Sequence, residues 1–284
     1  MLRFEPGSAP SALLANNMRE FNYIVPLAYN EDTEHPALYE SASGTYILNL
    51  AAKIGHLDGL RTCIRVGMDP NSSYNDYYPM HSAAIHGKTT AVRLMASMGG
   101  EVDLLDIGRG YTPLLSAVYK GYDQTVRELI RLGADVNFTN VDKLSPLTLA
   151  TLNGHHQIAD ILVRAGANIT QTDRHGDFQL NIACWQGHLR TAETLLRHGA
   201  NINAVSRSLQ TPLMSATHNA QVKMVEFLLK QSANKNVRNK NGETAEAIAR
   251  KFIRTCKNAA RKQLFIQIEK LLATPNTQNQ TITV

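Results

Sequence analysis

The sequence predicts an all-α solenoid of seven helix-pair units, and three recurring features support this prediction. Glycine returns at intervals of 32 to 34 residues along the middle of the chain, and Ala220 continues the series. Each of these positions is followed by an apolar stretch at helical spacing. Four units open on a Pro preceded by Thr, Ser or Tyr. The recurring glycines are Gly55, Gly87, Gly121, Gly154 and Gly187. A period near 33 residues is typical of arrays whose repeats pack on their neighbours.

Each unit is predicted to begin with a short helix that starts at its Pro. Proline fits the first helical position because its missing N–H would have no partner there, and a preceding Thr or Ser can cap the helix. The pairs are Tyr78-Pro79, Thr112-Pro113, Ser145-Pro146 and Thr211-Pro212. The recurring glycine then fits a left-handed turn. A second helix follows, with apolar residues at i, i+3 and i+4, as at Val126, Leu129 and Ile130.

These residues resemble the ankyrin repeat. Its Thr-Pro-Leu-His-x-Ala-Ala-x-x-Gly-His core is matched most closely by residues 79–84 and by Thr112-Pro113-Leu114, and also by Gly154-His155 and Gly187-His188. The resemblance covers about Ser43 to Leu272. It implies an ankyrin-repeat α-solenoid with β-hairpin fingers between the helix pairs, and it implies partner binding through the hairpin tips and the exposed, concave face of the first helices.

The two ends of the array and its fifth unit depart from the repeat. In unit one, residues 46–49 stand in place of Thr-Pro-Leu-His, and in unit five residues 178–181 are also off pattern. Unit seven begins near Asn241 and is predicted to be a C-terminal cap with a helix over 259–272, because a solenoid needs a polar outer surface at its end. Residues 1–42 are interpreted as an N-terminal extension with a possible capping helix, and residues 273–284 as a disordered tail.

Composition and charge limit the classes of protein to which the chain can belong. The chain has 284 residues and a net charge of +5, with 43% hydrophobic residues and no apolar run long enough to span a bilayer. Three widely spaced cysteines fit a reducing compartment. We therefore expect a cytoplasmic protein; a nuclear location, or action in a host cytosol after secretion, stays open. Between Lys230 and Lys270 there are eleven Lys/Arg and three acidic residues, so this end is strongly basic.

The sequence contains no recognisable catalytic, nucleotide-binding or metal-binding motif. Gly87-Lys88-Thr89 resembles the end of a phosphate-binding loop, but Ser82 occupies the position of the required first glycine. The recurring histidines follow the repeat and do not form a metal-ligand pattern. We expect no catalytic residue, no cofactor and no metal.

A partner site is predicted on the first helices and the residues just before them. Two rows of apolar and aromatic residues recur at these positions, and Tyr and Trp are common interface anchors. The predicted site residues are Tyr77, Ile85, Tyr111, Tyr119, Leu144, Leu152 and Trp185, with Arg109 and Arg174 near the hairpin tips.

The favoured interpretation is a monomeric, non-enzymatic protein-interaction module, acting as an adaptor or scaffold. It would bind an extended segment or a helix that carries apolar anchors. We expect a protein partner rather than nucleic acid. Two alternatives stay open: contact with nucleic acid or an acidic membrane through the basic C-terminal cap, which would be steeply salt-dependent, and an enzyme with an unrecognised site.

Overall fold

The computed structural model describes residues 42–74 and 78–274, with side chains from Thr45 onward. It divides into two compact units, the first ending at Val136 and the second beginning at Asn137. The predicted N-terminal extension and C-terminal tail lie almost wholly outside the described residues. No helix among the described residues is long and apolar enough to cross a membrane.

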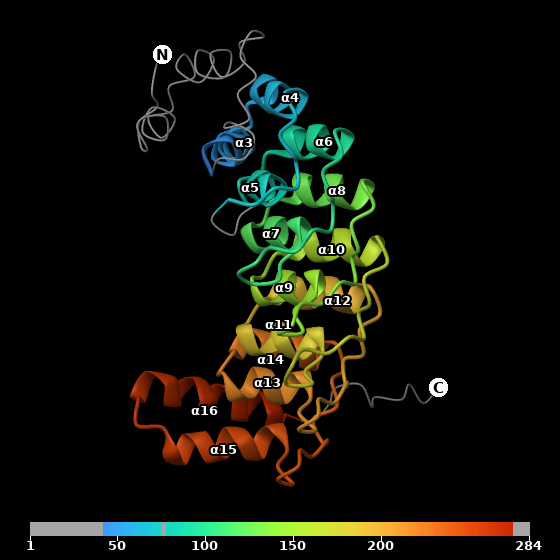
Figure 1. The fold of residues 1–284 in the computed structure, drawn as a ribbon. Coiled ribbons are helices and arrows are strands. Elements are labelled where there is room, and N and C mark those ends of the chain that lie inside the picture. Colours follow the sequence, from blue (N-terminus) through green and yellow to red (C-terminus); the bar gives the residue numbers. More distant parts are fainter. Residues whose placement is uncertain (1–41, 75–77, 275–284) are drawn as a thin grey trace, which may run out of the picture. The chain divides into compact units, whose positions relative to one another are not determined.

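Unit 1 contains three helix pairs (Figure 1). The first helices of the pairs pack on one another in the order α3, α5, α7, and the second helices pack in the order α4, α6, α8. The bounds are α3 (Ala42–Ile54), α4 (Leu57–Arg65), α5 (Pro79–Ile85), α6 (Thr89–Ser97), α7 (Pro113–Lys120) and α8 (Asp123–Arg131). We call the first helix of each pair the inner helix. The alanine pairs on α3 and α5 are fully buried, which lets these helices approach closely.

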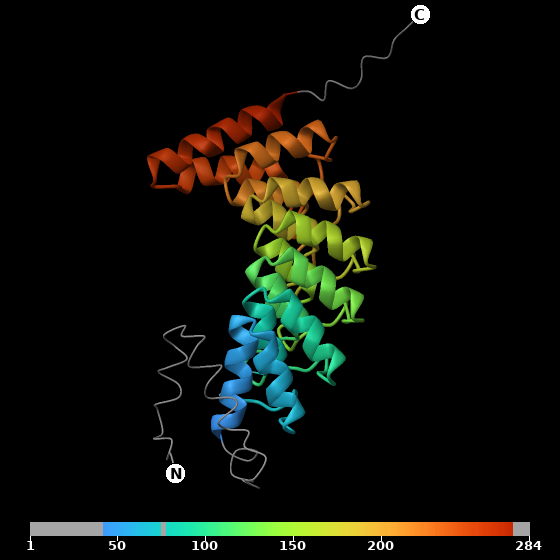
Figure 2. The same ribbon diagram turned by 90° about the horizontal axis from the view of Figure 1, so that it is seen from above.

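Unit 2 contains four helix pairs, the last of which is longer than the others (Figures 1 and 2). Its inner helices pack in the order α9, α11, α13, α15, and the last outer helix, α16, packs on α14 and α15. The bounds are α9 (Pro146–Leu152), α10 (His156–Arg164), α11 (Gln179–Gln186), α12 (Leu189–Arg197), α13 (Pro212–His218), α14 (Val222–Lys230), α15 (Ala245–Thr255) and α16 (Ala259–Ala273). The seven predicted helix pairs are thus all found in the described residues.

In the sixth repeat, the turn between the two helices keeps the left-handed backbone conformation of the other repeats without glycine. Ala220 takes the place of the turn glycine and has φ +58°, while Ser232 takes the place of the second turn glycine with φ +62°. Both lie in the left-handed region, which costs a non-glycine residue about 1–2 kcal/mol. The sequence register, in which Ala220 continues the glycine series, is therefore confirmed at the level of the backbone.

The predicted helix caps form where the sequence supplies Thr or Ser. The hydroxyl oxygens of Thr112, Ser145 and Thr211 accept hydrogen bonds from the N–H three residues later, at 3.1–3.2 Å. The fifth repeat lacks this cap, but it keeps a hydrogen bond from its inner helix to the backbone of the next finger with a different side chain. In the second repeat, the buried His81 ring nitrogen lies 2.8 Å from the Tyr111 carbonyl. In the fifth repeat, Asn181 takes this place and donates to the Gln210 carbonyl at 2.8 Å.

The fingers between helix pairs reverse the direction of the chain, as the predicted β-hairpins would. They do so as tight turns rather than as paired strands. Thr172 and Phe178 form an isolated antiparallel bridge, and no longer strand occurs in the part of the chain described. The reason is a side chain that bonds the turn itself: the Asn140 side-chain oxygen accepts from the Asp142 and Leu144 N–H groups. The equivalent residues in other fingers are Asp106, Asp173, Ser206 and Asn239. With these N–H groups used locally, little ladder pairing remains.

Asparagine side chains also link consecutive repeats. Asn137 donates to the Gly166 carbonyl and accepts from the Asn168 N–H, at 3.1 and 2.8 Å. In unit 1, Asn71 bonds Gly99 and Glu101 in the same way. These bonds join backbone groups about 30 residues apart, so they fix the spacing of neighbouring helix pairs.

Candidate functional site

Three predicted site residues of unit 1, Arg109, Tyr111 and Tyr119, form a small cluster at α7. The rings of Tyr111 and Tyr119 meet edge to face with centroids 6.5 Å apart. The Arg109 guanidinium lies 5.8 Å from the first ring centroid and 5.7 Å from the second. The three residues therefore lie together, and Arg109 contributes by covering the rings as well as by its charge.

The exposure predicted for Tyr111 is wrong. Tyr111 is only 8% exposed, whereas Tyr119 is 37% exposed. Arg109 and Tyr119 cover the Tyr111 ring, and burial raises the pKa of its hydroxyl. Tyr111 is thus a packing residue, and Tyr119 is the member of the pair that presents surface.

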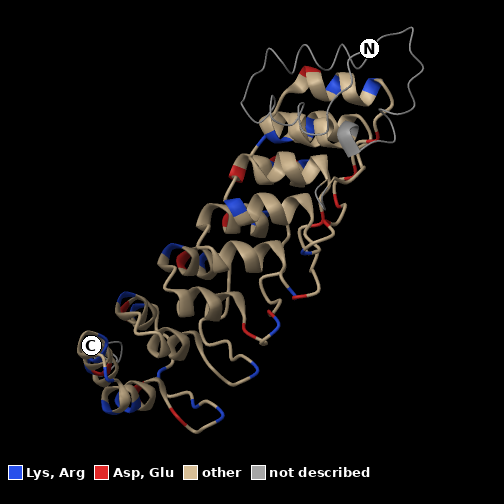
Figure 3. Ribbon diagram, turned by 60° about the vertical axis from the view of Figure 1, so that its left-hand side comes forward, with Lys and Arg blue, Asp and Glu red and all other residues tan. Residues whose placement is uncertain are grey.

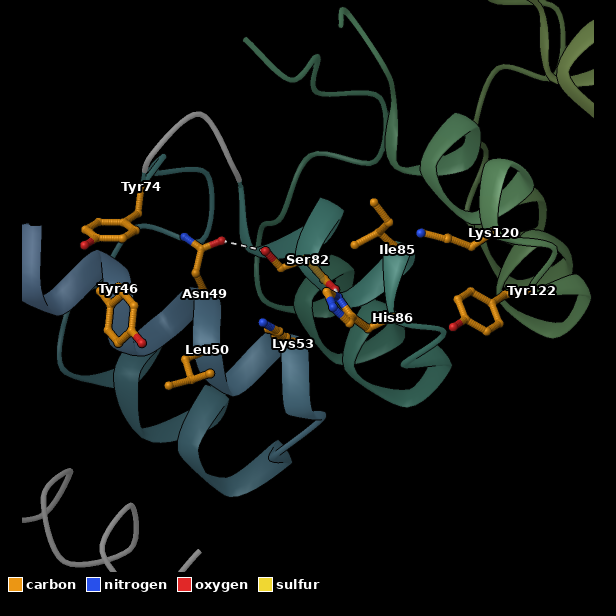
Figure 4. Close-up of a pocket in the computed structure, with 10 residues that line it drawn as sticks. All are labelled: Tyr46, Asn49, Leu50, Lys53, Tyr74, Ser82, Ile85, His86, Lys120 and Tyr122. Carbon is orange, nitrogen blue, oxygen red and sulfur yellow. Dashed lines mark hydrogen bonds between the residues drawn. The ribbon is translucent and has the colours of Figure 1, made fainter. Parts of the chain in front are cut away.

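A second feature of unit 1 is a cavity of about 570 Å³ formed by α3, α5, α7 and the residues that follow them (Figure 4). Ile85, a predicted site residue, lies in its wall and is half-buried. The Ser82 hydroxyl donates to the Asn49 side-chain oxygen at 2.9 Å between α5 and α3. The remaining lining residues are Tyr46, Leu50, Lys53, Tyr74, His86, Lys120 and Tyr122.

The tyrosines of this cavity are held by specific contacts. Tyr46 and Tyr74 meet edge to face at 5.0 Å, and burial together with Tyr74 raises the pKa of the Tyr46 hydroxyl. Tyr122 lies against Gly87, where a side-chain Cβ would come within 2.8 Å of the ring. The absence of a side chain at Gly87 thus lets the ring form this wall. Lys53 and Lys120 come from α3 and α7, on either side of His86 in Figure 4.

Unit 2 carries a row of four rings that extends from α11 to α16. Trp185 packs on His218 with centroids 6.1 Å apart, and His218 packs on Phe252 at 5.5 Å. Phe252 stacks on the fully buried Phe265 at 4.8 Å. Trp185, at the end of the row, is 47% exposed. Burial lowers the pKa of His218, so the ring next to Trp185 is neutral near pH 7. We call these four residues the aromatic row.

Polar contacts fix the backbone beneath Trp185. The Asn219 side chain donates to the Trp185 carbonyl at 2.7 Å. Arg261 of α16 donates to the Asn219 side-chain oxygen at 3.4 Å, and its guanidinium lies 5.9 Å from the Phe265 centroid. The exposed tryptophan therefore sits on a surface that the C-terminal helix pair supports.

The other predicted residues of unit 2 are less exposed or engaged elsewhere. Leu144 and Leu152 are half-buried. Arg174 is exposed at its finger, with its guanidinium 3.7 Å from the Asp142 carboxylate and its Nε donating to the His175 ring. Tyr77 lies outside the described residues.

The basic C-terminal cluster is partly neutralised within the fold (Figure 3). Arg250 forms ion pairs with Glu246 and Glu269 at 2.6 and 2.8 Å, and Lys251 pairs with Glu243 at 2.8 Å. All three acidic residues of this stretch are thereby paired. The other basic residues near the turn between α15 and α16 are Arg254, Lys257, Arg261 and Lys262.

The reactive side chains are placed for packing. Cys63 and Cys184 are buried. Burial raises the pKa of the Cys63 thiol to about 12 and also raises the pKa of the Cys184 thiol. Both thiols are therefore protonated and unreactive at neutral pH. In the described part of the chain, no group of three or more His, Cys, Asp or Glu residues is placed to hold a metal ion.

Comparison with known proteins identifies the repeat. The family model for ankyrin repeats in three copies matches residues 48–140, 98–173, 114–206 and 180–261, which together span most of the chain. The chain belongs to the ankyrin-repeat family. Ankyrin repeats are typically protein-interaction modules, so the general class of function follows from this membership.

Solved ankyrin-repeat structures share the fold. The ankyrin repeat domain of human ASB11 matches with a TM-score of 0.67 and 25% identity, over 80% of this chain and 98% of that one. The ankyrin repeat domain of Bcl-3, described as a unique member of the IkappaB family, matches with a TM-score of 0.68 and 24% identity over the same shares of the two chains. No curated protein matches the chain.

Two groups of residues that form or support this ankyrin-repeat surface were not predicted from the sequence. Phe252 and Phe265 lie in the divergent cap, outside the repeat register that led to Trp185. Tyr74 and Tyr122 lie in turns, where the register gives no orientation. Lys53 and His218 do occupy the register of the predicted row, but they are not apolar, so a search for apolar anchors passed over them.

Proposed function

We propose that this ankyrin-repeat protein binds a segment of a partner protein on the surface of its inner helices, without catalysing a reaction. The observation that carries the proposal is the aromatic row, where a half-exposed Trp185 is held over His218 by packing that continues into the cap. Ordered aromatic side chains lose little conformational freedom on binding, which makes them effective anchors. Tyr119 in unit 1 offers a second exposed ring.

The partner would carry apolar anchors on an extended segment or a helix. We further propose that the chain acts as a monomeric adaptor in the cytoplasm. The three free cysteines support a reducing compartment, and the buried thiols with raised pKa values argue against nucleophilic catalysis at Cys63 and Cys184.

The test is affinity capture with the wild-type chain and the Trp185→Ala variant in parallel, quantified by mass spectrometry. Trp185→Phe serves as the matched control because it retains an aromatic ring. We expect a partner to be retained by wild type and Trp185→Phe and to be depleted at least tenfold by Trp185→Ala. Equal capture by all three proteins would overturn the proposed face.

A further inference from the structure

The cavity of unit 1 has an unusual chemical composition. Of its ten lining residues, two are lysines, one is histidine and three are tyrosines, and none carries a carboxylate. Neither Lys53 nor Lys120 forms an ion pair among the described residues; Lys120 lies 5.3 Å from the Tyr119 ring centroid. Two lysines thus line the same cavity, and the described residues that line it supply no negative charge.

The remaining lining groups suit a hydrogen-bonding, partly apolar ligand. The hydroxyl of Tyr46 stays protonated because burial raises its pKa, so it can donate a hydrogen bond. Leu50 and Ile85 add apolar surface. Asn49 and Ser82 are already bonded to each other, which keeps α3 and α5 in place beneath the cavity. Its volume of about 570 Å³ is in the range of pockets that hold ligands.

We infer that this cavity binds a carboxylate-bearing peptide segment of a protein partner, with Lys53 and Lys120 facing its acidic side chains and Ile85 contacting an apolar or aromatic one. The inference rests on the proposed function, because it assigns the chemistry of a segment bound on the inner helices. Charge complementarity selects this occupant: a cavity whose described lining has two lysines and no carboxylate favours an acidic segment over a basic one.

Nucleic acid is the less suitable anion. It is bound along a track of many basic residues, whereas residues 42–136 contain nine Lys/Arg and nine Asp/Glu and carry no net charge. Of these nine basic residues, only Lys53 and Lys120 line the cavity.

The experiment measures the fluorescence anisotropy of a labelled glutamate–tyrosine copolymer titrated with the full chain at physiological salt. We expect wild type to bind, and Lys53→Glu with Lys120→Glu to weaken binding at least tenfold. The matched control is Lys223→Glu with Lys240→Glu, which changes the net charge equally at exposed lysines of unit 2 and should alter binding less than twofold. If the reversed pair fails to fold by circular dichroism, Lys53→Met with Lys120→Met keeps the aliphatic stems and should show the same loss.

Three outcomes would overturn the inference: no binding by wild type, equal losses in the cavity and control variants, or equally tight binding of a twelve-residue oligothymidylate with the same losses. The last would make the cavity a general polyanion site. The outcome is separable from that of the proposed function, because Trp185→Ala tests the aromatic row of unit 2. Partner capture that depends on Trp185, with copolymer binding indifferent to Lys53 and Lys120, would refute the cavity inference alone.

Discussion

Tyr111 and Tyr119 show how residues with the same chemistry come to differ in role. They lie eight residues apart, one before the inner helix and one near its end, and both occupy positions at which the repeat predicts surface. Arg109 and Tyr119 cover Tyr111, and Tyr119 stays exposed. The covering arginine lies in the finger, so its effect could not be predicted from the repeat register.

Substitution of these two tyrosines should therefore have opposite consequences. Tyr111→Ala removes a buried ring and should lower the free energy of unfolding by about 2–4 kcal/mol. Tyr119→Ala removes a partly exposed ring and should cost less than about 1 kcal/mol. Urea denaturation followed by circular dichroism measures both. Equal losses for the two variants would show that Tyr119, too, is a packing residue.

A second prediction concerns Glu128, whose buried carboxylate receives hydrogen bonds from Arg93 on α6 and Arg131 on α8 at 2.6–3.2 Å. These bonds lower its pKa to about 2. Because the folded pKa lies below the unfolded value, the stabilisation is complete above about pH 4.5 and is lost as the pH falls towards 2. Glu128→Gln should destabilise the protein by about 1–2 kcal/mol at pH 7, after allowance for the exposed arginines.

The difference between wild type and Glu128→Gln should shrink between about pH 4.5 and pH 2 in thermal melts. Glu226→Gln is the control, because it removes the same charge from an exposed pair with Lys230 and should cost at most about 0.5 kcal/mol. A difference at Glu128 that does not vary with pH would show that the ion pairs are not its cause.

At the scale of the element, the conformation of the helix–helix turns was predicted more fully than that of the fingers. The glycine register predicted left-handed turns, and Ala220 and Ser232 adopt that conformation without glycine. The resemblance to ankyrin repeats also implied β-hairpins, but the described fingers contain only an isolated bridge because Asn140 and its equivalents bond the finger N–H groups themselves. A local side-chain bond of this kind competes with strand pairing and is hard to anticipate from spacing alone.

Ala220→Gly should consequently stabilise the protein by about 0.5–1 kcal/mol, because glycine relieves the left-handed strain despite its greater freedom in the unfolded chain. The same chemical change at Ala247, an exposed position in α15, should destabilise by about 0.5–1 kcal/mol. Urea titration of the two variants gives both values. The same sign at both positions would show that Ala220 is not strained.

At the scale of the whole molecule, the helix pairs could be predicted and much of the surface could not. The repeat gives seven helix pairs and places Trp185, Tyr119 and Ile85 on inner helices. It does not give the cavity around Lys53, whose walls come partly from turns, nor the continuation of the aromatic row into Phe252, which lies in the divergent cap. The total charge was similarly uninformative, since the basic cap uses Arg250 and Lys251 in its own ion pairs.

We propose that the inner-helix surface binds a partner through Trp185. The most direct measurement is the dissociation constant of the captured partner for wild type and Trp185→Ala, taken together with the melting temperature of each protein. We expect roughly thirtyfold weaker binding by Trp185→Ala, equivalent to about 2 kcal/mol, with its melting temperature within a few degrees of wild type. Unchanged affinity with a sharply lower melting temperature would contradict it, because Trp185 would then be a packing residue and the partner would bind elsewhere.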